Sequence, residues 1–161
     1  MRPLSRLAAG SLSVGSVFLA AMLGSAAAAR NISPWYESLA KPPLTPPNWV
    51  FGPVWTFLYI LMAIALYRVL RSHRAAPGRG LAILLFALQL ALNAGWSILF
   101  FGAQSPTLGL VVIVALEASL LATIYAFWRV DRMASFCLLP YALWVAFATY
   151  LNAGIWALNL T

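Results

Sequence analysis

The stretch WYESLAKPPLTPPNWVFGPVW, residues 35–55, holds three tryptophans and five prolines within 21 residues. The chain on both sides of this stretch is almost purely apolar. Pro42, Pro43, Pro46 and Pro47 restrict φ and bias the residues before them toward extended backbone, so the first half is a stiff connection. The stretch therefore separates two apolar segments and begins the second of them.

Composition favours an integral membrane protein. Of the 161 residues, 63% are hydrophobic and 8% are charged, whereas soluble domains average about 45–50% apolar and about 25% charged residues. A water-soluble fold of this length could not bury so much apolar surface, because small domains have a high surface-to-volume ratio. The single cysteine, Cys137, permits no internal disulfide.

Five segments are long and apolar enough to span a bilayer, which takes about 20 residues. They cover residues 7–29, 49–70, 80–102, 107–128 and 133–160. Their apolar runs are continuous rather than alternating, which predicts helices and not barrel strands. A loop at residues 30–48 is the longest connection. The predicted fold class is all-α, a single five-helix transmembrane bundle over residues 1–161.

The first segment has a second interpretation. Arg2 and Arg6 precede it and SAAAAR, residues 25–30, ends it, as in secretory signals cleaved after small residues. Its 23 residues exceed a typical signal core, which favours a retained helix.

Basic residues are distributed unevenly between the two sides of the predicted bundle. Two of the ten, Arg30 and Lys41, lie in the 30–48 loop. The other eight lie at the N-terminus and in the turns after the second and fourth segments: Arg2, Arg6, Arg68, Arg71, Arg74, Arg79, Arg129 and Arg132. The positive-inside rule then places the N-terminus in the cytoplasm, for insertion into a bacterial inner membrane. The sequence does not choose between inner and outer membrane. We interpret the charge as an orientation signal and expect no nucleic-acid partner.

The 30–48 loop has two interpretations. Thr45 can cap the second helix with Pro46 at its first position, and Trp35 and Tyr36 suit the membrane interface. The loop is then either an aromatic belt with a rigid turn, or a stiff lid over the mouth of a pocket.

The third segment carries a polar and aromatic face. Its members are spaced so that they fall within about 40° of one another on a helix: Gln89, Asn93, Trp96 and Phe100. Such groups at bilayer depth turn toward the bundle interior. They serve either as hydrogen bonds between helices or as the lining of an internal cavity.

Rows of small residues lie on two segments. Ala87, Ala91 and Gly95 lie opposite the polar face of the third segment, and a comparable row follows the first segment: Ala20, Gly24 and Ala28. Either row allows close helix approach, within one chain or between two copies in a homodimer.

Aromatic stripes follow the second and fifth segments at helical spacing. They are Phe51, Trp55, Tyr59 and Met62, and Tyr141, Trp144, Ala148 and Asn152. Core packing explains such stripes, but together with the polar face they also describe an apolar pocket with few polar anchors, suited to a flat ligand such as a porphyrin or a sterol.

Glu117, near the middle of the fourth segment, is either a proton-relay or ligand-anchoring group, or a protonated carboxyl bonded to a neighbouring helix.

Catalytic patterns are missing from the sequence. His73 is the single histidine and lies in a basic turn, Cys137 has no partner at zinc-ligand spacing, and Asp131 lies between Arg129 and Arg132 as a local charge partner. We therefore expect no metal site, no required cofactor and no catalytic residue. Any chemistry would come from a ligand, or from redox-active tryptophan and tyrosine beside it.

Five motifs in order resemble the TspO/MBR family of tryptophan-rich sensory proteins and translocator proteins, once called peripheral benzodiazepine receptors. They are WYESLAKP at 35–42, PP at 46–47, VFGPVWTFLY at 50–59, NAGW at 93–96 and PYALWVAFATYLN at 140–152. The resemblance implies a dimeric five-helix bundle that binds porphyrins, such as protoporphyrin IX and haem, and isoquinoline and benzodiazepine-type drugs. The implied ligand-binding residues are Tyr36, Trp55, Gln89, Asn93, Trp144 and Ala148.

The resemblance leaves three functional alternatives. These are a sensory protein for tetrapyrroles, a transporter of a lipophilic ligand, and an enzyme of light-dependent porphyrin breakdown, for which Trp55 and Trp144 match the family's implicated tryptophans.

The sequence departs from the family's pattern at two positions. Leu44 replaces a tryptophan found in many relatives, so the lid is expected to stack less well on a flat ligand. The family's sterol motif includes a basic residue after the tyrosine, and no basic residue follows Tyr150 here. Sterol binding is therefore disfavoured.

Overall fold

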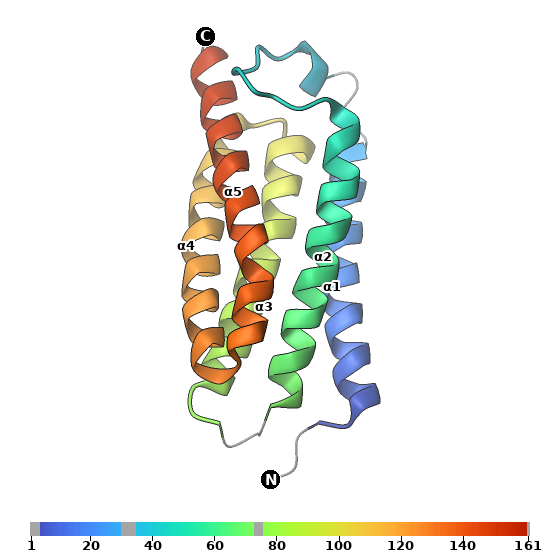
Figure 1. Ribbon diagram of the computed structural model, residues 1–161. Helices are drawn as coiled ribbons and strands as arrows, with labels where there is room; N and C mark the ends of the chain where they lie inside the picture. The colour runs from blue at the N-terminus through green and yellow to red at the C-terminus, as the bar shows by residue number, and fades with distance from the viewer. Residues whose placement is uncertain (1–3, 30–34, 73–75, 161) are drawn as a thin grey trace.

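The computed structural model describes residues 4–29, 35–72 and 76–160, and it forms a five-helix bundle (Figure 1). The spans are α1 (Arg6–Ala29), α2 (Asn48–Arg71), α3 (Arg79–Ser97), α4 (Pro106–Val130) and α5 (Arg132–Leu158). A π-helical turn, η2 (Ile98–Gly102), extends α3, and a short 3₁₀ turn, η1 (Tyr36–Ser38), lies in the first loop. All five helices are long and apolar enough to cross a membrane, which confirms the predicted fold class. Arg2, Arg30, His73 and Arg74 lie outside the described residues.

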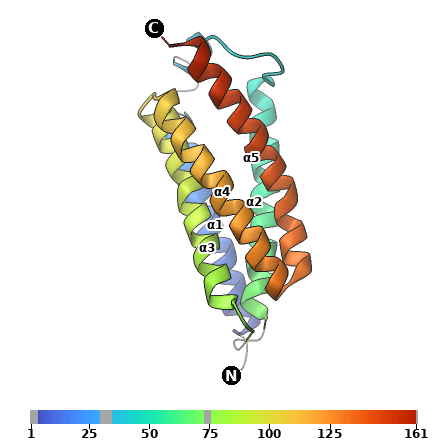
Figure 2. The same cartoon turned by 90° about the vertical axis from the view of Figure 1, so that its left-hand side faces the viewer.

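The helices form a closed ring in the order α1, α2, α5, α4, α3, with α1 packed against both α2 and α3. Figures 1 and 2 show the two ends of this bundle. The start of α1 and the α2–α3 and α4–α5 connections lie at one end, which we call the basal end. Residues 35–47 and the end of α5 lie at the other, which we call the lid end. This order places α1, α2 and α3 around one side of the bundle, where the site described below is found.

The predicted cap of α2 was wrong, although the span predicted over residues 49–70 begins within one residue of the observed helix. The helix begins at Asn48 after Pro47, and the Thr45 hydroxyl donates to the carbonyl oxygen of Pro42 at 2.7 Å instead of capping it. A residue before a proline is disfavoured in helical backbone, so Pro46 cannot begin a helix ahead of Pro47. Thr45 therefore stabilises the loop rather than α2.

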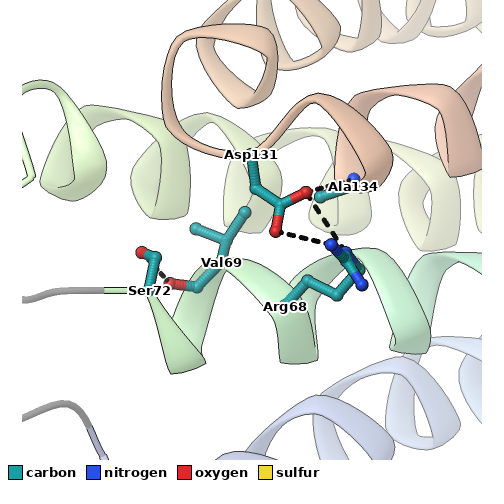
Figure 3. Close-up of polar contacts among 5 residues, drawn as sticks. All are labelled: Arg68, Val69, Ser72, Asp131 and Ala134. Atoms are coloured by element: carbon teal, nitrogen blue, oxygen red, sulfur yellow. Dashed lines mark hydrogen bonds and ion pairs between the residues drawn. The ribbon is translucent and has the colours of Figure 1, made fainter.

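An ion pair closes the basal end (Figure 3). The Arg68 guanidinium bonds both carboxylate oxygens of Asp131 at 3.0 and 3.1 Å, and the same carboxylate accepts from the Ala134 N–H at 2.9 Å. Asp131 thus caps α5 and ties the α4–α5 turn to α2. The expectation that it pairs with its sequence neighbours was wrong, because its side chain turns inward to the helix start and to Arg68.

The two rows of small residues lie on opposite sides of the bundle wall. The α1 row faces inward, and a Cβ added at Gly24 would lie 3.1 Å from Ser97 Oγ. The α3 row faces outward: Ala87 and Ala91 are exposed, and a Cβ at Gly95 would meet nothing within 4 Å. The α1 row is therefore an internal helix contact, whereas the α3 row lies on the outer surface.

We expect Gly109→Ala to destabilise the bundle, because a Cβ there would lie 2.6 Å from Phe100 Cδ2 and 2.8 Å from Asn152 Oδ1. Overpacking of this kind costs roughly 1–3 kcal/mol. Thermal unfolding in detergent should show a midpoint lowered by several degrees. The matched control is Gly15→Ala, whose Cβ meets nothing within 4 Å. Alanine is the better helix former, so the control should be neutral or slightly stabilising. Equal midpoints for both variants would contradict the close contact.

Candidate ligand-binding site

A cavity of about 370 Å³ lies at the lid end between α1, α2, α3 and the first loop. This volume is at the lower end of the range for small-molecule sites, about 300–1,000 Å³. Its aromatic wall comprises Tyr36, Phe51, Trp55, Tyr59, Trp96 and Phe101. The facing wall, from α1, comprises Ala21, Gly24, Ser25, Ala28 and Ala29. The cavity is therefore a slot with rings on one side and small side chains on the other.

The aromatic wall has Trp55 at its centre. Its ring centroid lies 5.5 Å from that of Tyr59 and 6.4 Å from that of Trp96, with interplanar angles of 30° and 31°. The edge of Trp55 meets Tyr141 behind it at 6.1 Å. Three rings held in related orientations present one broad apolar surface to the slot, with which a flat aromatic ligand could make offset-stacked contacts.

The first loop covers this wall through contacts with the π-helical turn. Trp35 packs edge-on against Phe100 at 5.5 Å, and Tyr36 packs against Phe101 at 5.7 Å. Burial raises the pKa of Tyr36, so its hydroxyl remains protonated at neutral pH and can donate a hydrogen bond. The Lys41 ammonium lies 4.8 Å from the centroid of the Tyr36 ring and adds a positive charge beside the cavity.

The loop is fixed to α5 by polar contacts. The Asn159 side chain accepts from the Ala40 N–H at 3.1 Å and donates to the Ala40 carbonyl at 2.9 Å, and the Tyr150 hydroxyl donates to the Pro43 carbonyl at 3.0 Å. Gly154 provides the space for Pro42, since a Cβ at 154 would lie 2.6 Å from the proline ring. Local sequence patterns do not reveal these contacts, because each one joins positions more than 100 apart in the chain.

Asn93 lies one layer behind the aromatic wall rather than in the slot. It accepts from the Tyr59 hydroxyl at 2.9 Å and donates to the Tyr141 hydroxyl at 2.9 Å, joining α2, α3 and α5. In the next layer, Trp96 Nε1 donates to Asn152 Oδ1 at 3.0 Å. Interhelical hydrogen bonding thus accounts for the buried amides of both asparagines. Asn93 reaches the slot only through Tyr59, which lines it.

Of the six residues that the family resemblance implies as ligand contacts, two line the slot and four do not. Tyr36 and Trp55 line the slot, whereas Gln89, Asn93, Trp144 and Ala148 do not. Trp144 is separated from the slot by Phe51, whose ring lies 5.9 Å from it. Ligand contact by Gln89, Asn93, Trp144 and Ala148 stays a prediction.

Three further side chains hold buried polar atoms without a partner among the described residues. They are both amide atoms of Gln89, Oε2 of Glu117 and Nε1 of Trp144. These atoms leave buried hydrogen-bonding capacity on α3, α4 and α5, outside the slot.

We expect Gly154→Ala to loosen the loop, because the added methyl displaces Pro42 from its seat on α5. Amide hydrogen exchange over residues 39–45 should accelerate by tenfold or more, and Asn159→Ala should act in the same direction because it removes both bonds to Ala40. Leu158→Ala is the matched control, since Leu158 is 54% exposed at the same helix end. Unchanged exchange in Gly154→Ala and Asn159→Ala would show that the loop is held elsewhere.

Known proteins resemble this chain over most of its length. The model of the TspO/MBR family matches residues 13–157. The tryptophan-rich protein TspO of Chlorobaculum tepidum is 45% identical over 148 residues, which cover 92% of this chain and 94% of the relative. The tryptophan-rich sensory protein of Cereibacter sphaeroides is 38% identical, covering 88% and 89% of the two chains. The human translocator protein is 38% identical, covering 78% and 75%. With its five membrane-spanning helices, the chain belongs to the TspO/MBR family of multi-pass integral membrane proteins.

Proposed function

We propose that this protein binds porphyrins, such as protoporphyrin IX and haem, in the slot at the lid end, and that this binding serves tetrapyrrole sensing or a stress response. The observation that carries the proposal is the shape of the slot, an aromatic wall centred on Trp55 facing a row of small residues on α1. A flat macrocycle buries both faces in such a slot, and apolar burial contributes about 25 cal/mol per Å².

Polar groups at the mouth suit the carboxylates of these porphyrins. Tyr36 provides a protonated hydroxyl, and Asn48 and Thr56 line the same cavity. The Lys41 ammonium, over the Tyr36 ring, donates to the backbone carbonyls of Glu37 and Leu39 at 3.1 Å each. A ligand carboxylate could exchange for those carbonyls, because a charge-assisted hydrogen bond is stronger than one to a neutral oxygen.

Filling the slot should weaken porphyrin binding. Ala28 lines the α1 wall, so Ala28→Leu is expected to weaken protoporphyrin IX binding at least tenfold, measured as the dissociation constant from saturable quenching of tryptophan emission. Ala115→Leu adds the same volume to an exposed position on α4, outside the slot, and should leave the constant unchanged. Equal affinity for both variants would reject the slot as the site.

The same titration separates tetrapyrroles from sterols. Haem should compete with protoporphyrin IX, whereas cholesterol should not. The Tyr150 hydroxyl is already engaged with the Pro43 carbonyl, and no basic residue follows it in the sequence. Competition by cholesterol at similar concentrations would overturn this expected selectivity.

Light-dependent porphyrin breakdown is a second candidate function. Trp55 lines the slot and lies in ring contact with Tyr59 and Trp96, so an oxidised tryptophan beside the ligand would have aromatic neighbours. We expect illumination to bleach the Soret band of bound porphyrin faster than that of free porphyrin. Trp55→Phe should reduce this excess bleaching rate more than Trp49→Phe, which changes an exposed tryptophan. Identical bleaching of bound and free porphyrin would leave binding alone.

The outward row on α3 supports a homodimer. In a Cys137→Ala background, Gly95→Cys should form a disulfide-linked dimer in membranes, because small residues on an outer face allow close helix approach. Gly24→Cys should not, because Gly24 is buried against Ser97. Crosslinking through Gly24→Cys without Gly95→Cys would overturn this interface.

The basal end carries Arg6, Arg68, Arg71, Arg79, Arg129 and Arg132, and the positive-inside rule supports placing this end in the cytoplasm.

A further inference from the structure

A second cavity lies on the outer surface of the bundle, far from the slot. It is a groove of about 390 Å³ between α4 and α5, in their basal halves. Leu121, Tyr125 and Trp128 line it from α4, and Phe136 and Leu139 line it from α5. Leu121 and Trp128 are seven residues apart, so the groove runs about 10 Å along the α4 axis at 1.5 Å per residue.

The groove opens toward the lipid. Leu121, Tyr125 and Phe136 are 53%, 65% and 48% exposed, and the groove contains few polar atoms. The Trp128 and Phe136 rings meet edge-to-face with centroids 5.4 Å apart, which fixes its basal part. Because α4 and α5 are membrane-spanning, an apolar hollow on this face is in contact with hydrocarbon chains.

Two arginines stand at the basal mouth of the groove. The Arg132 guanidinium lies 5.0 Å from the centroid of the Trp128 ring, and Arg129 Nη1 donates to the Tyr125 hydroxyl at 3.3 Å. Each cation is thus held by a side chain that lines the groove. They flank the α4–α5 turn, at the depth where a helix leaves the hydrocarbon core and where tryptophan and tyrosine are favoured.

Within the part of the chain that the structure describes, neither arginine forms an ion pair with a carboxylate. The chain has three acidic residues: Glu37 lies in the first loop, Glu117 lies in mid-span, and Asp131 is engaged by Arg68 and by the start of α5. The mouth therefore combines positive charge with an apolar groove that extends into the bilayer. This combination matches a molecule with an anionic head and a hydrocarbon tail.

We propose that the groove binds an anionic phospholipid, with its phosphate paired to Arg129 and Arg132 and one acyl chain lying along Leu121, Tyr125 and Leu139. The two arginines hold the headgroup at the basal interface. Because the groove accommodates an acyl chain at one position, the site binds an individual lipid, in contrast to general adsorption of anionic lipids to a basic surface. Basic pockets between helices on the cytoplasmic side are typical sites for such headgroups. The site is independent of the proposed porphyrin slot.

The test is a lipid titration of the purified full-length protein, followed by native mass spectrometry. Dioleoyl phosphatidylglycerol should bind the wild type about 25-fold more tightly than dioleoyl phosphatidylcholine, from about fivefold for each arginine near the interface. The double variant Arg129→Gln/Arg132→Gln should lose this preference. The charge control is Arg6→Gln at the same end of the bundle, where Arg6 is exposed, compared with Arg132→Gln alone. Arg132→Gln should lose about fivefold, and Arg6→Gln should retain wild-type affinity.

The groove is tested separately from the charge. Leu139→Trp fills it without changing any charge and should weaken phosphatidylglycerol binding at least fivefold, whereas Leu143→Trp, one turn further along α5 at a 74% exposed position outside the groove, should not. Equal losses for Arg6→Gln and Arg132→Gln, or no loss for Leu139→Trp, would reduce the effect to general surface charge and overturn the proposal. Unfolding temperatures measured without added lipid distinguish a lost site from a misfolded variant.

Discussion

The slot-containing half of the bundle depends on the hydrogen bonds of the Asn93 side-chain amide. An amide without hydrogen-bond partners is costly in hydrocarbon. Asn93 accepts a hydrogen bond from the Tyr59 hydroxyl of α2 and donates one to the Tyr141 hydroxyl of α5. The direct contact between α2 and α3 is otherwise slight, because α1 lies between them in the ring of helices. The bond from Tyr59 therefore holds the aromatic wall in place while leaving room in front of it. The Trp55 ring packs against Tyr59 in a tilted contact, so the same bond supports its position.

The π-helical turn at the end of α3 is the second constraint. One extra residue per turn changes the direction in which successive side chains leave the helix, and such turns are frequent at functional sites. Here adjacent residues, Phe100 and Phe101, both contact the first loop, with rings 4.9 Å apart and nearly perpendicular. Phe100 also meets α4 at Gly109. A regular α-helical end would turn adjacent side chains about 100° apart around the axis, which makes a shared partner harder to reach.

The sequence allowed the five spans and the inward face of α3 to be predicted, because both depend on local hydrophobicity and helical period. Tyr36 and Trp55 were identified through motifs and do lie together in the slot. The α1 wall was not identified, since small residues at helical spacing look the same whether they contact another helix or face a cavity; Gly24 does both. The partner of Asp131 and the seat of Pro42 depend on positions far away in the chain, and local patterns carry no information about them.

The first loop combines a strained residue with several compensating contacts. Leu44 has a φ of 67° and is 80% exposed, and left-handed backbone costs a residue with a Cβ roughly 1–2 kcal/mol. The bonds from Thr45, Tyr150 and Asn159 hold the segment in this conformation, and each is exposed or partly exposed. Because Leu44 does not line the slot, the loop is closed by its polar contacts to α5 and by Tyr36 rather than by residue 44. Release of those few bonds would relieve the strain at Leu44, so opening of the loop is less costly than its number of contacts suggests. A loop held in this way would remain closed over the apolar slot and still open for the porphyrin that we propose as its ligand.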